Sequence, residues 1–321
     1  AIAVSMLAFM LLRLTGDQAT NALSLAASMA GGTAAQFGTM AKPLHAGLAA
    51  QAGVTAAYWA AAGVSAGVQA LDGPAGLQRL MAGPDLAAAR DGLTAPAHGH
   101  SLHFATETIG DPVMLTAYGA RVKRFANCGS AHRTMDAVAA LMNDTGLKAA
   151  DVARVDVFAP AAHLANLPYQ RPSTGAEAKF SLPFAVACLL TGHGGGPDAF
   201  RDALVDDAAV QALAARVRCH PIDRGEAVCP TRLVVCLNDG STAERQVDHP
   251  LGSLARPLPQ ALLTQKTTAC LSVRLSHAER QAFDDLVADV GALGDARRLI
   301  TTLLSGGAVG LSQTDGLHGA A

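Results

Sequence analysis

The chain has 321 residues, of which half are hydrophobic and 16% are charged, and its formal net charge is −2. This composition is typical of one large or two ordinary folded domains and excludes a globally disordered chain. The near-neutral charge, the absence of a long Lys or Arg run and the 4% aromatic content argue against a nucleic-acid-binding surface.

The front of the chain predicts three alanine-rich helices. Residues 1–14 lack a polar face, so this helix should be buried on most sides. Asp17 is the predicted N-cap of a second helix over residues 18–30. A third helix over residues 43–62 begins with a proline, which suits a first helical turn. The small residues of these helices allow close packing, as in a compact helical bundle.

The apolar run at the start of the chain does not predict a membrane span. It covers residues 1–12 with one interruption at Ser5, and Arg13 ends it, whereas a span needs about 20 apolar residues. No basic segment precedes the run, as a signal peptide would require. The chain also begins in what looks like the middle of a helix and without an initiating methionine, so we expect upstream residues to be missing.

A lysine and a histidine three residues apart, Lys42 and His45, stand at the predicted start of the third helix. The amide groups and the positive dipole end of a helix favour an anion there, and a lysine adds a full charge. One interpretation is therefore a corner that binds a carboxylate. The other is a solvated lysine and a packed histidine ahead of an alanine-rich core helix.

The middle of the chain mixes helices and strands. Residues 151–158 alternate polar and apolar side chains, which predicts a half-buried strand. Asn238-Asp239-Gly240 predicts a hairpin turn between strands over residues 232–237 and 241–247. Further helices are predicted over residues 130–143, 182–190, 207–217, 259–266, 276–290 and 295–304. The expected fold class is therefore mainly α, with an α+β domain inserted in a helical one.

The cysteines and one group of histidines give no metal site. The six cysteines are scattered without a CxxC pair, which favours reduced thiols in a cytoplasm-like compartment. His98, His100 and His103 have a spacing that a zinc site could use, but no fourth ligand or supporting shell can be placed. We expect an exposed loop or a strand edge there, and no bound metal.

A second polar cluster joins a cysteine and a histidine. Cys128 and His132 are four residues apart near a helix start, and Lys123-Arg124 precedes them. The pair could be a nucleophile with its base, part of a metal site, or a small loop cysteine with a packed histidine. The neighbouring cations would lower the pKa of a thiol and attract carboxylates.

A third cluster, Glu177 and Lys179, precedes another helix. It is either a functional edge or a helix-start ion pair worth less than about 1 kcal/mol. The three clusters share Lys, Arg and His side chains with few acids beside them. This combination suits an anionic, polycarboxylate substrate.

These clusters lie in blocks that resemble a known family. Residues 38–53 closely resemble the signature of the MmgE/PrpD family, and residues 123–137 look like its second block. Residues 177–187 look like the third block, and residues 238–240 and 252–257 fit the closing strands. The blocks stand in family order and cover nearly the whole chain.

The resemblance implies a large helical domain, here residues 1–122 and 256–321, and a smaller α+β lid over residues 123–255, with the active site between them. It implies a homodimer that uses neither a metal nor an iron–sulfur cluster and acts on small polycarboxylates. The activity implied is a lyase like 2-methylcitrate dehydratase, an enzyme of propionate catabolism, which eliminates water by general acid–base chemistry. Alternatives are an epimerase or isomerase of the same family, or an incomplete homologue that only binds or dimerises.

The resemblance also assigns roles to residues. Lys42 matches the family's active-site lysine, which binds a substrate carboxylate or assists proton transfer. Cys128 stands where the decarboxylase branch carries a histidine, and His132 is the nearest imidazole left in that block. Family members carry an aspartate and further histidines upstream, so the catalytic set of this chain is expected to be incomplete. The predicted catalytic residues are Lys42, His132 and Cys128, and the predicted substrate-binding residues are Lys42, His45, Lys123, Arg124 and Lys179.

Overall fold

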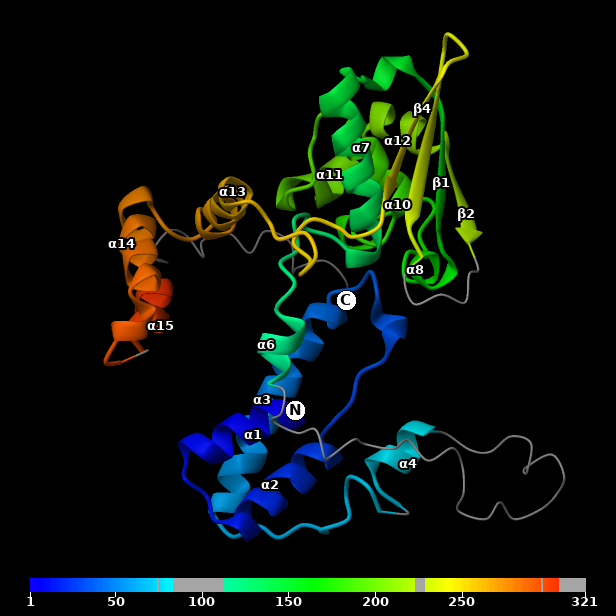
Figure 1. Cartoon of the computed structure of the whole chain (residues 1–321). Helices are drawn as coiled ribbons and strands as arrows, with labels where there is room; N and C mark the ends of the chain where they lie inside the picture. Colours follow the sequence, from blue (N-terminus) through cyan, green and yellow to red (C-terminus); the bar gives the residue numbers. More distant parts are fainter. Residues whose placement is uncertain (74, 83–112, 223–228, 296, 306–321) are drawn as a thin grey trace, which may run out of the picture. The chain divides into compact units, whose positions relative to one another are not determined.

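The computed structural model of the chain describes residues 1–73, 75–82, 113–222, 229–295 and 297–305 (Figure 1). The chain divides into two compact units, residues 1–118 and 119–321. Over the described ranges the protein is mostly helical, and its sheet is a small mixed one of four strands in the second unit. The predicted mixture of helices with a minor α+β part is therefore confirmed.

The first unit is built on the three predicted helices, which pack on one another: α1 (Ile2–Leu11), α2 (Gly16–Ser28) and α3 (Ala41–Ala61). Gly53 is where α1 meets α3, because a Cβ at that position would lie 2.4 Å from the carbonyl oxygen of Ala1. The small residues of α3 therefore serve helix packing at this point. The predicted N-cap of α2 was wrong by two residues. Thr15 is the cap, since its hydroxyl accepts from the amide of Gln18, and Asp17 lies in the first turn.

The rest of the described first unit consists of short segments. They are η1 (Ala34–Gln36), α4 (Leu77–Ala82) and α6 (Met114–Tyr118). The histidine group at residues 98–103 lies outside the described residues.

The sheet of the second unit has the strand order β2-β1-β3-β4. β1 runs parallel to β2 and antiparallel to β3, and the predicted Asn238-Asp239-Gly240 turn joins β3 to β4. In this register Val157 lies opposite Cys219 on one side and Leu233 on the other. The strands are β1 (Val152–Pro160), β2 (Val217–Ile222), β3 (Thr231–Leu237) and β4 (Thr242–Val247).

β2 was not predicted, and the helix expected over residues 207–217 was too long. That helix, α12, covers only Ala208–Ala214, and Asp207 caps it by accepting hydrogen bonds from two amides of the first turn. Val217 then starts a strand at the sheet edge. The apolar pattern of a short helix running into a short strand does not show where one period ends and the other begins.

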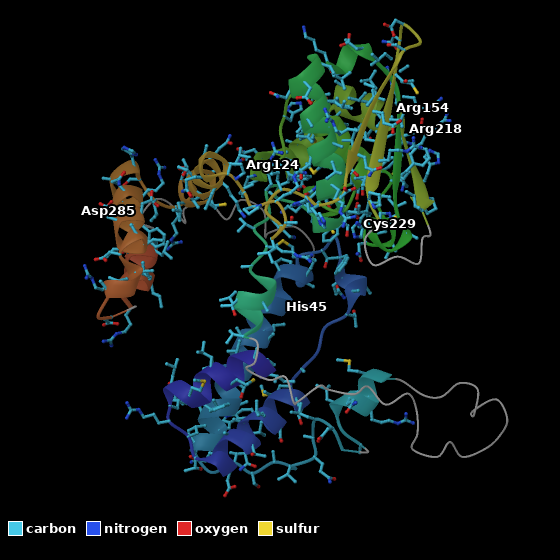
Figure 2. The ribbon with its side chains drawn as sticks, viewed as in Figure 1. His45, Arg124, Arg154, Arg218, Cys229 and Asp285 are labelled. Carbon is cyan, nitrogen blue, oxygen red and sulfur yellow. The ribbon has the colours of Figure 1, made fainter. Side chains whose placement is uncertain are left out.

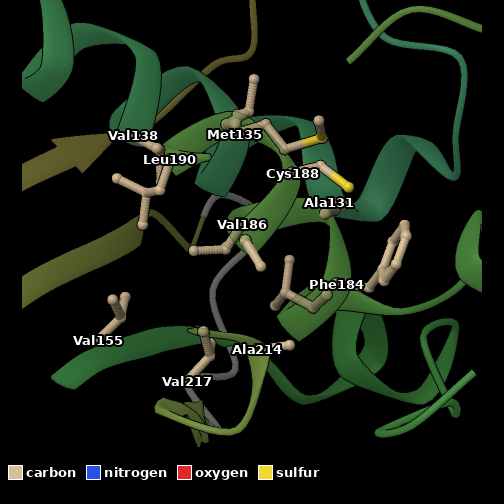
Figure 3. Close-up of a cluster of buried hydrophobic side chains, with 14 of the residues drawn as sticks. Ala131, Met135, Val138, Val155, Phe184, Val186, Cys188, Leu190, Ala214 and Val217 are labelled. Carbon is tan, nitrogen blue, oxygen red and sulfur yellow. The ribbon is translucent and has the colours of Figure 1, made fainter. Parts of the chain in front are cut away.

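Helices cover one face of the sheet and enclose the hydrophobic core (Figure 1). Each of the nine residues of α10 (Leu182–Leu190) is buried, as expected for a helix that is apolar on all sides. Its side chains belong to one buried cluster with Met135 and Val138 from α7 (His132–Thr145) and Val155 from β1, which Figure 3 draws as sticks. The shorter helices of this layer are η3 (Gly129–Ala131), α8 (Ala161–Ala165), α9 (Gly175–Ala178) and α11 (Asp202–Val205).

The three helices predicted at the end of the chain are present. They are α13 (Gln260–Leu271), α14 (His277–Ala288) and α15 (Arg297–Ser305). Ser276 and Glu279 form a reciprocal capping box that starts α14. Among the helices that are described, none is both long and apolar enough to cross a bilayer.

Candidate functional site

The structure brings the second predicted cluster together at the N-terminal end of α7. The segment leading into this helix folds back on itself, so that Lys123 Nζ donates to the carbonyl oxygen of Asn127 at 3.2 Å. His132, the first residue of α7, also hydrogen-bonds the backbone of Asn127. The lysine and the imidazole are therefore held to the same short stretch of main chain.

The imidazole of His132 is buried and polar at the same time. The residue is 3% exposed, its ring meets the edge of Phe125 at a centroid distance of 5.3 Å, and its Nε2 has no hydrogen-bond partner among the described residues. Burial lowers its pKa to about 4, and the positive charges of Lys123, Lys266 and Arg124 act in the same direction. The hydrogen bond to Asn127 opposes this shift. At neutral pH the ring is therefore uncharged and has an unused nitrogen.

Arg124 is held by a buried carboxylate one helical turn after the histidine. Its Nη1 donates to Asp136 Oδ1 at 2.8 Å, and its guanidinium carbon lies 4.8 Å from the centre of the Phe125 ring. The other carboxylate oxygen of Asp136 accepts from the amide of Leu251 at 2.7 Å. Figure 2 shows Arg124 at this edge of the second unit.

The second and third predicted clusters meet through their main chains. The amide of Cys128 donates to the carbonyl oxygen of Lys179 at 2.9 Å. The half-buried Cys128 packs against the hydrophobic core, whereas Lys179 is exposed. Glu177 accepts from the amide and the hydroxyl of Ser173, at 2.7 and 2.8 Å. Its carboxylate thus holds the loop ahead of α9.

Lys42 and His45 belong to the first unit and are described separately from these clusters. Lys42 is the second residue of α3, and its Nζ lies 5.3 Å from the centre of the Phe37 ring, within cation–π range. His45 is in the first turn, where its Nδ1 lies 3.0 Å from the position a Cβ would take at Gly32. The histidine therefore packs against the glycine turn that precedes η1.

The site also contains residues that the sequence did not reveal. Lys266, on α13, donates from Nζ to the carbonyl oxygen of Lys123 at 2.7 Å, across 143 residues of sequence. No local sequence pattern predicts a contact between residues so far apart in the chain. Asp136 had a weak signal, because it stands four residues after His132 on a predicted helix and therefore shares its face.

A separate polar group, also not predicted, lies on the sheet face opposite the core. Asp156 Oδ1 is 2.9 Å from His220 Nε2, and its Oδ2 accepts from Arg154 Nε at 2.7 Å. Burial raises the pKa of Asp156, but the hydrogen bonds from His220 and Arg154 outweigh it, so the pKa is lowered overall. Figure 2 shows Arg154 and Arg218 along the strands, apart from Arg124.

The groups at the N-terminal end of α7 combine an unprotonated imidazole with positive charge. A buried, neutral imidazole among several cations can accept a proton from a bound anion, and the cations can stabilise the negative charge that results. Among the described residues no group of three His, Cys, Asp or Glu side chains could hold a metal ion. Such an arrangement can bind an anion and accept a proton from it.

The chain belongs to the MmgE/PrpD family. The MmgE/PrpD N-terminal domain matches residues 1–89, and the MmgE/PrpD C-terminal domain matches residues 125–291. The chain is also similar to cis-aconitate decarboxylase of Homo sapiens, with 27% identity over 303 residues. That alignment covers 92% of this chain and 59% of the human protein, so the chain spans about three fifths of its relative's length. The predicted family is confirmed.

Proposed function

We propose that the chain is a lyase that acts on small di- and tricarboxylates and eliminates water by general acid–base chemistry, in the manner of 2-methylcitrate dehydratase. The observation that carries this proposal is the buried imidazole of His132, whose Nε2 has no partner among the described residues. A buried polar atom without a partner is costly in a purely structural role. It is useful where a substrate supplies the partner.

In the proposed reaction, a proton leaves the carbon beside a carboxylate and the neighbouring hydroxyl leaves as water. His132 accepts the carbon-bound proton, and its other ring nitrogen stays fixed by Asn127. The negative charge that develops on the carboxylate is stabilised by Lys123. Cys128, just before the same helix start, is the candidate that donates the proton with which the hydroxyl leaves as water, and it then recovers a proton from His132.

The low proton affinity of His132 supports an anionic substrate. Lys123, Lys266 and Arg124 all lower the pKa of His132. Two or three substrate carboxylates would offset these charges and raise that pKa, so that the imidazole becomes a competent base only when a polyanion is bound. The site would thereby discriminate between polycarboxylates and neutral acids.

Further substrate contacts are assigned by the same reasoning. Among the described residues Arg124 pairs with Asp136 through Nη1 alone, which leaves other N–H donors of the guanidinium for a substrate, and the exposed Lys179 is joined to Cys128 through its main chain. In the first unit, Lys42 is the proposed carboxylate-binding and catalytic residue, and His45 is its supporting neighbour in α3.

A second candidate activity is decarboxylation of an unsaturated tricarboxylate. The similarity to human cis-aconitate decarboxylase supports it. Both activities need a proton transfer beside a carboxylate and cations that stabilise an enolate-like charge. The cysteine at position 128, where the resemblance places a histidine in the decarboxylase branch, favours the elimination of water.

The finer architecture is also a proposal. We expect residues 123–255 to form the lid of the family, residues 1–122 and 256–321 its helical domain, and the protein to be a homodimer. Light scattering on the purified chain measures the mass directly, and a monomer at every concentration would contradict the last expectation.

The test is a turnover assay of the purified full chain with 2-methylcitrate, citrate and cis-aconitate. Dehydration appears as a rising absorbance of the conjugated double bond, and decarboxylation appears as carbon dioxide release. We expect His132→Gln and Lys123→Ala to abolish turnover of the acid on which the wild-type protein acts. Lys148→Ala, which removes an exposed lysine of the same unit, is the control and is expected to retain turnover. A folded wild-type chain that turns over none of these acids would refute the proposal and favour a binding role.

A further inference from the structure

The carboxylate of Asp136 is buried and has two partners on two different segments. The side chain is 3% exposed, and it accepts from Arg124 Nη1 at 2.8 Å and from the amide of Leu251 at 2.7 Å. Removing a carboxylate from water is costly unless such partners replace the lost hydration. The position of the carboxylate therefore dictates where both partner segments lie on α7.

The two partner segments are also locked to each other. The amide of Val122 donates to the carbonyl oxygen of Gly252 at 2.8 Å, and the amide of Gly252 donates to the carbonyl oxygen of Arg256 at 2.8 Å. Gly252 has φ +87°, and a Cβ there would lie 1.8 Å from the carbonyl oxygen of Val122. Only glycine permits this approach. The segments around residues 122 and 252 thus form one layer, and Asp136 attaches that layer to α7.

The backbone of Lys123 is held within this layer, although the residue is exposed. Its neighbours on either side, Val122 and Arg124, are fixed by Gly252 and Asp136. Its own carbonyl oxygen accepts from Lys266 Nζ at 2.7 Å. Its side chain can therefore reach the Asn127 carbonyl beside His132.

We propose that Asp136 is the positioning residue of this site, which holds Lys123 and Arg124 beside His132 at the N-terminal end of α7. The role in substrate binding rests on the function proposed above, whereas the placement of the charges does not. Among the described residues no hydrogen bond joins Asp136 to the imidazole, whereas its carboxylate holds Arg124 and the amide of Leu251, so its proposed influence passes through the residues it holds. If Asp136 served stability alone, its replacement in a folded variant would leave Lys123 and Arg124 in place.

The test compares Asp136→Asn with the wild type, with Asp136→Glu and with Asp144→Asn. Asp144 lies on the same helix and pairs with Arg245, so its replacement breaks an ion pair on α7 away from the site. The first readout is the titration of His132, followed by nuclear magnetic resonance without any ligand. We expect Asp136→Asn to raise the pKa of His132 by about one unit, a tenfold change in proton affinity, because Lys123 and Arg124 move away.

The sign of that change separates positioning from direct electrostatics. Loss of a negative charge near an imidazole lowers its pKa, whereas release of two cations raises it. Asp136→Glu keeps the charge and is expected to restore most of the wild-type value, and Asp144→Asn is expected to match the wild type. An unchanged or lowered pKa of His132 in folded Asp136→Asn would overturn the proposal. Should that variant not fold, Asp136→Ser replaces it in the titration, and an unchanged or lowered pKa of His132 would again overturn the proposal.

The second readout is binding of tricarballylate, an unreactive tricarboxylate, measured by calorimetry. We expect Asp136→Asn to weaken its Kd about tenfold, as loss of one charge-assisted contact does. If the wild-type protein binds no tricarballylate, the proposed function is contradicted. The titration of His132 without ligand then still measures whether Asp136 positions the charges. Tight binding by Asp136→Asn, equal to that of the wild type, would contradict the positioning role itself.

Discussion

The buried imidazole of His132 predicts how the stability of the protein depends on pH. Its pKa is about 4 in the folded chain and 6.5 in the unfolded chain. Between these values the unfolded state binds more protons, so the free energy of unfolding falls as the pH falls from 6.5 to 4. The separation corresponds to about 3 kcal/mol, present in full above pH 6.5 and lost at pH 4.

The measurement is urea denaturation at several pH values between 4 and 7, for the wild type and for His132→Gln. Other groups titrate in this range, so the prediction concerns the difference between the two proteins. We expect that difference to shrink by about 3 kcal/mol on going from pH 7 to pH 4, because the variant has no imidazole to protonate. His193→Gln, which removes an exposed histidine of the same unit, reports what the loss of any histidine does. Parallel curves for His132→Gln and the wild type would refute the argument that His132 is held neutral by its surroundings.

Two further predictions concern the charges and the backbone of the same site. Lys266→Met should raise the pKa of His132, but by less than Lys123→Met does, since Lys123 is the larger of the two charge effects; a resonance titration of each variant measures both. Gly252→Ala should cost more than about 3 kcal/mol of unfolding free energy, because its Cβ would overlap a carbonyl oxygen. Gly240→Ala has nearly the same φ, +88° against +87°, but open space around it, so it should cost only about 1 kcal/mol, and equal losses in urea denaturation would contradict this.

Local signals in the sequence were sufficient for most of the fold. The hairpin turn at Asn238-Asp239-Gly240 and the continuous apolar run of α10 each act within a few residues. Such features depend on backbone geometry and on the periodicity of apolar side chains, and both are determined by residues that are neighbours in the sequence. The strand β2 has no such local signal, because it is defined by its pairing with β1, which lies some 60 residues earlier in the chain.

The site was less accessible to sequence reasoning than the fold. The spacing of Cys128 and His132 drew attention to the start of α7, but it left three interpretations open. What makes His132 unusual is its burial under Phe125 and its surroundings of positive charge, to which Lys266 contributes from 143 residues away. Neither burial nor a long-range charge contact has a local sequence pattern.

The geometry of α7 explains why packing and chemistry are coupled in this unit. Met135 is fully buried in the core, yet its sulfur accepts from the side-chain amide of Asn127 at 3.1 Å. The backbone of Asn127 in turn holds both Lys123 and His132. When a site lies on a packed helix, the side chains that fill the core also fix the polar contacts, so the polar groups keep a constant arrangement. The proton affinity of His132 is therefore set by the packing of α7 as much as by the charges beside it.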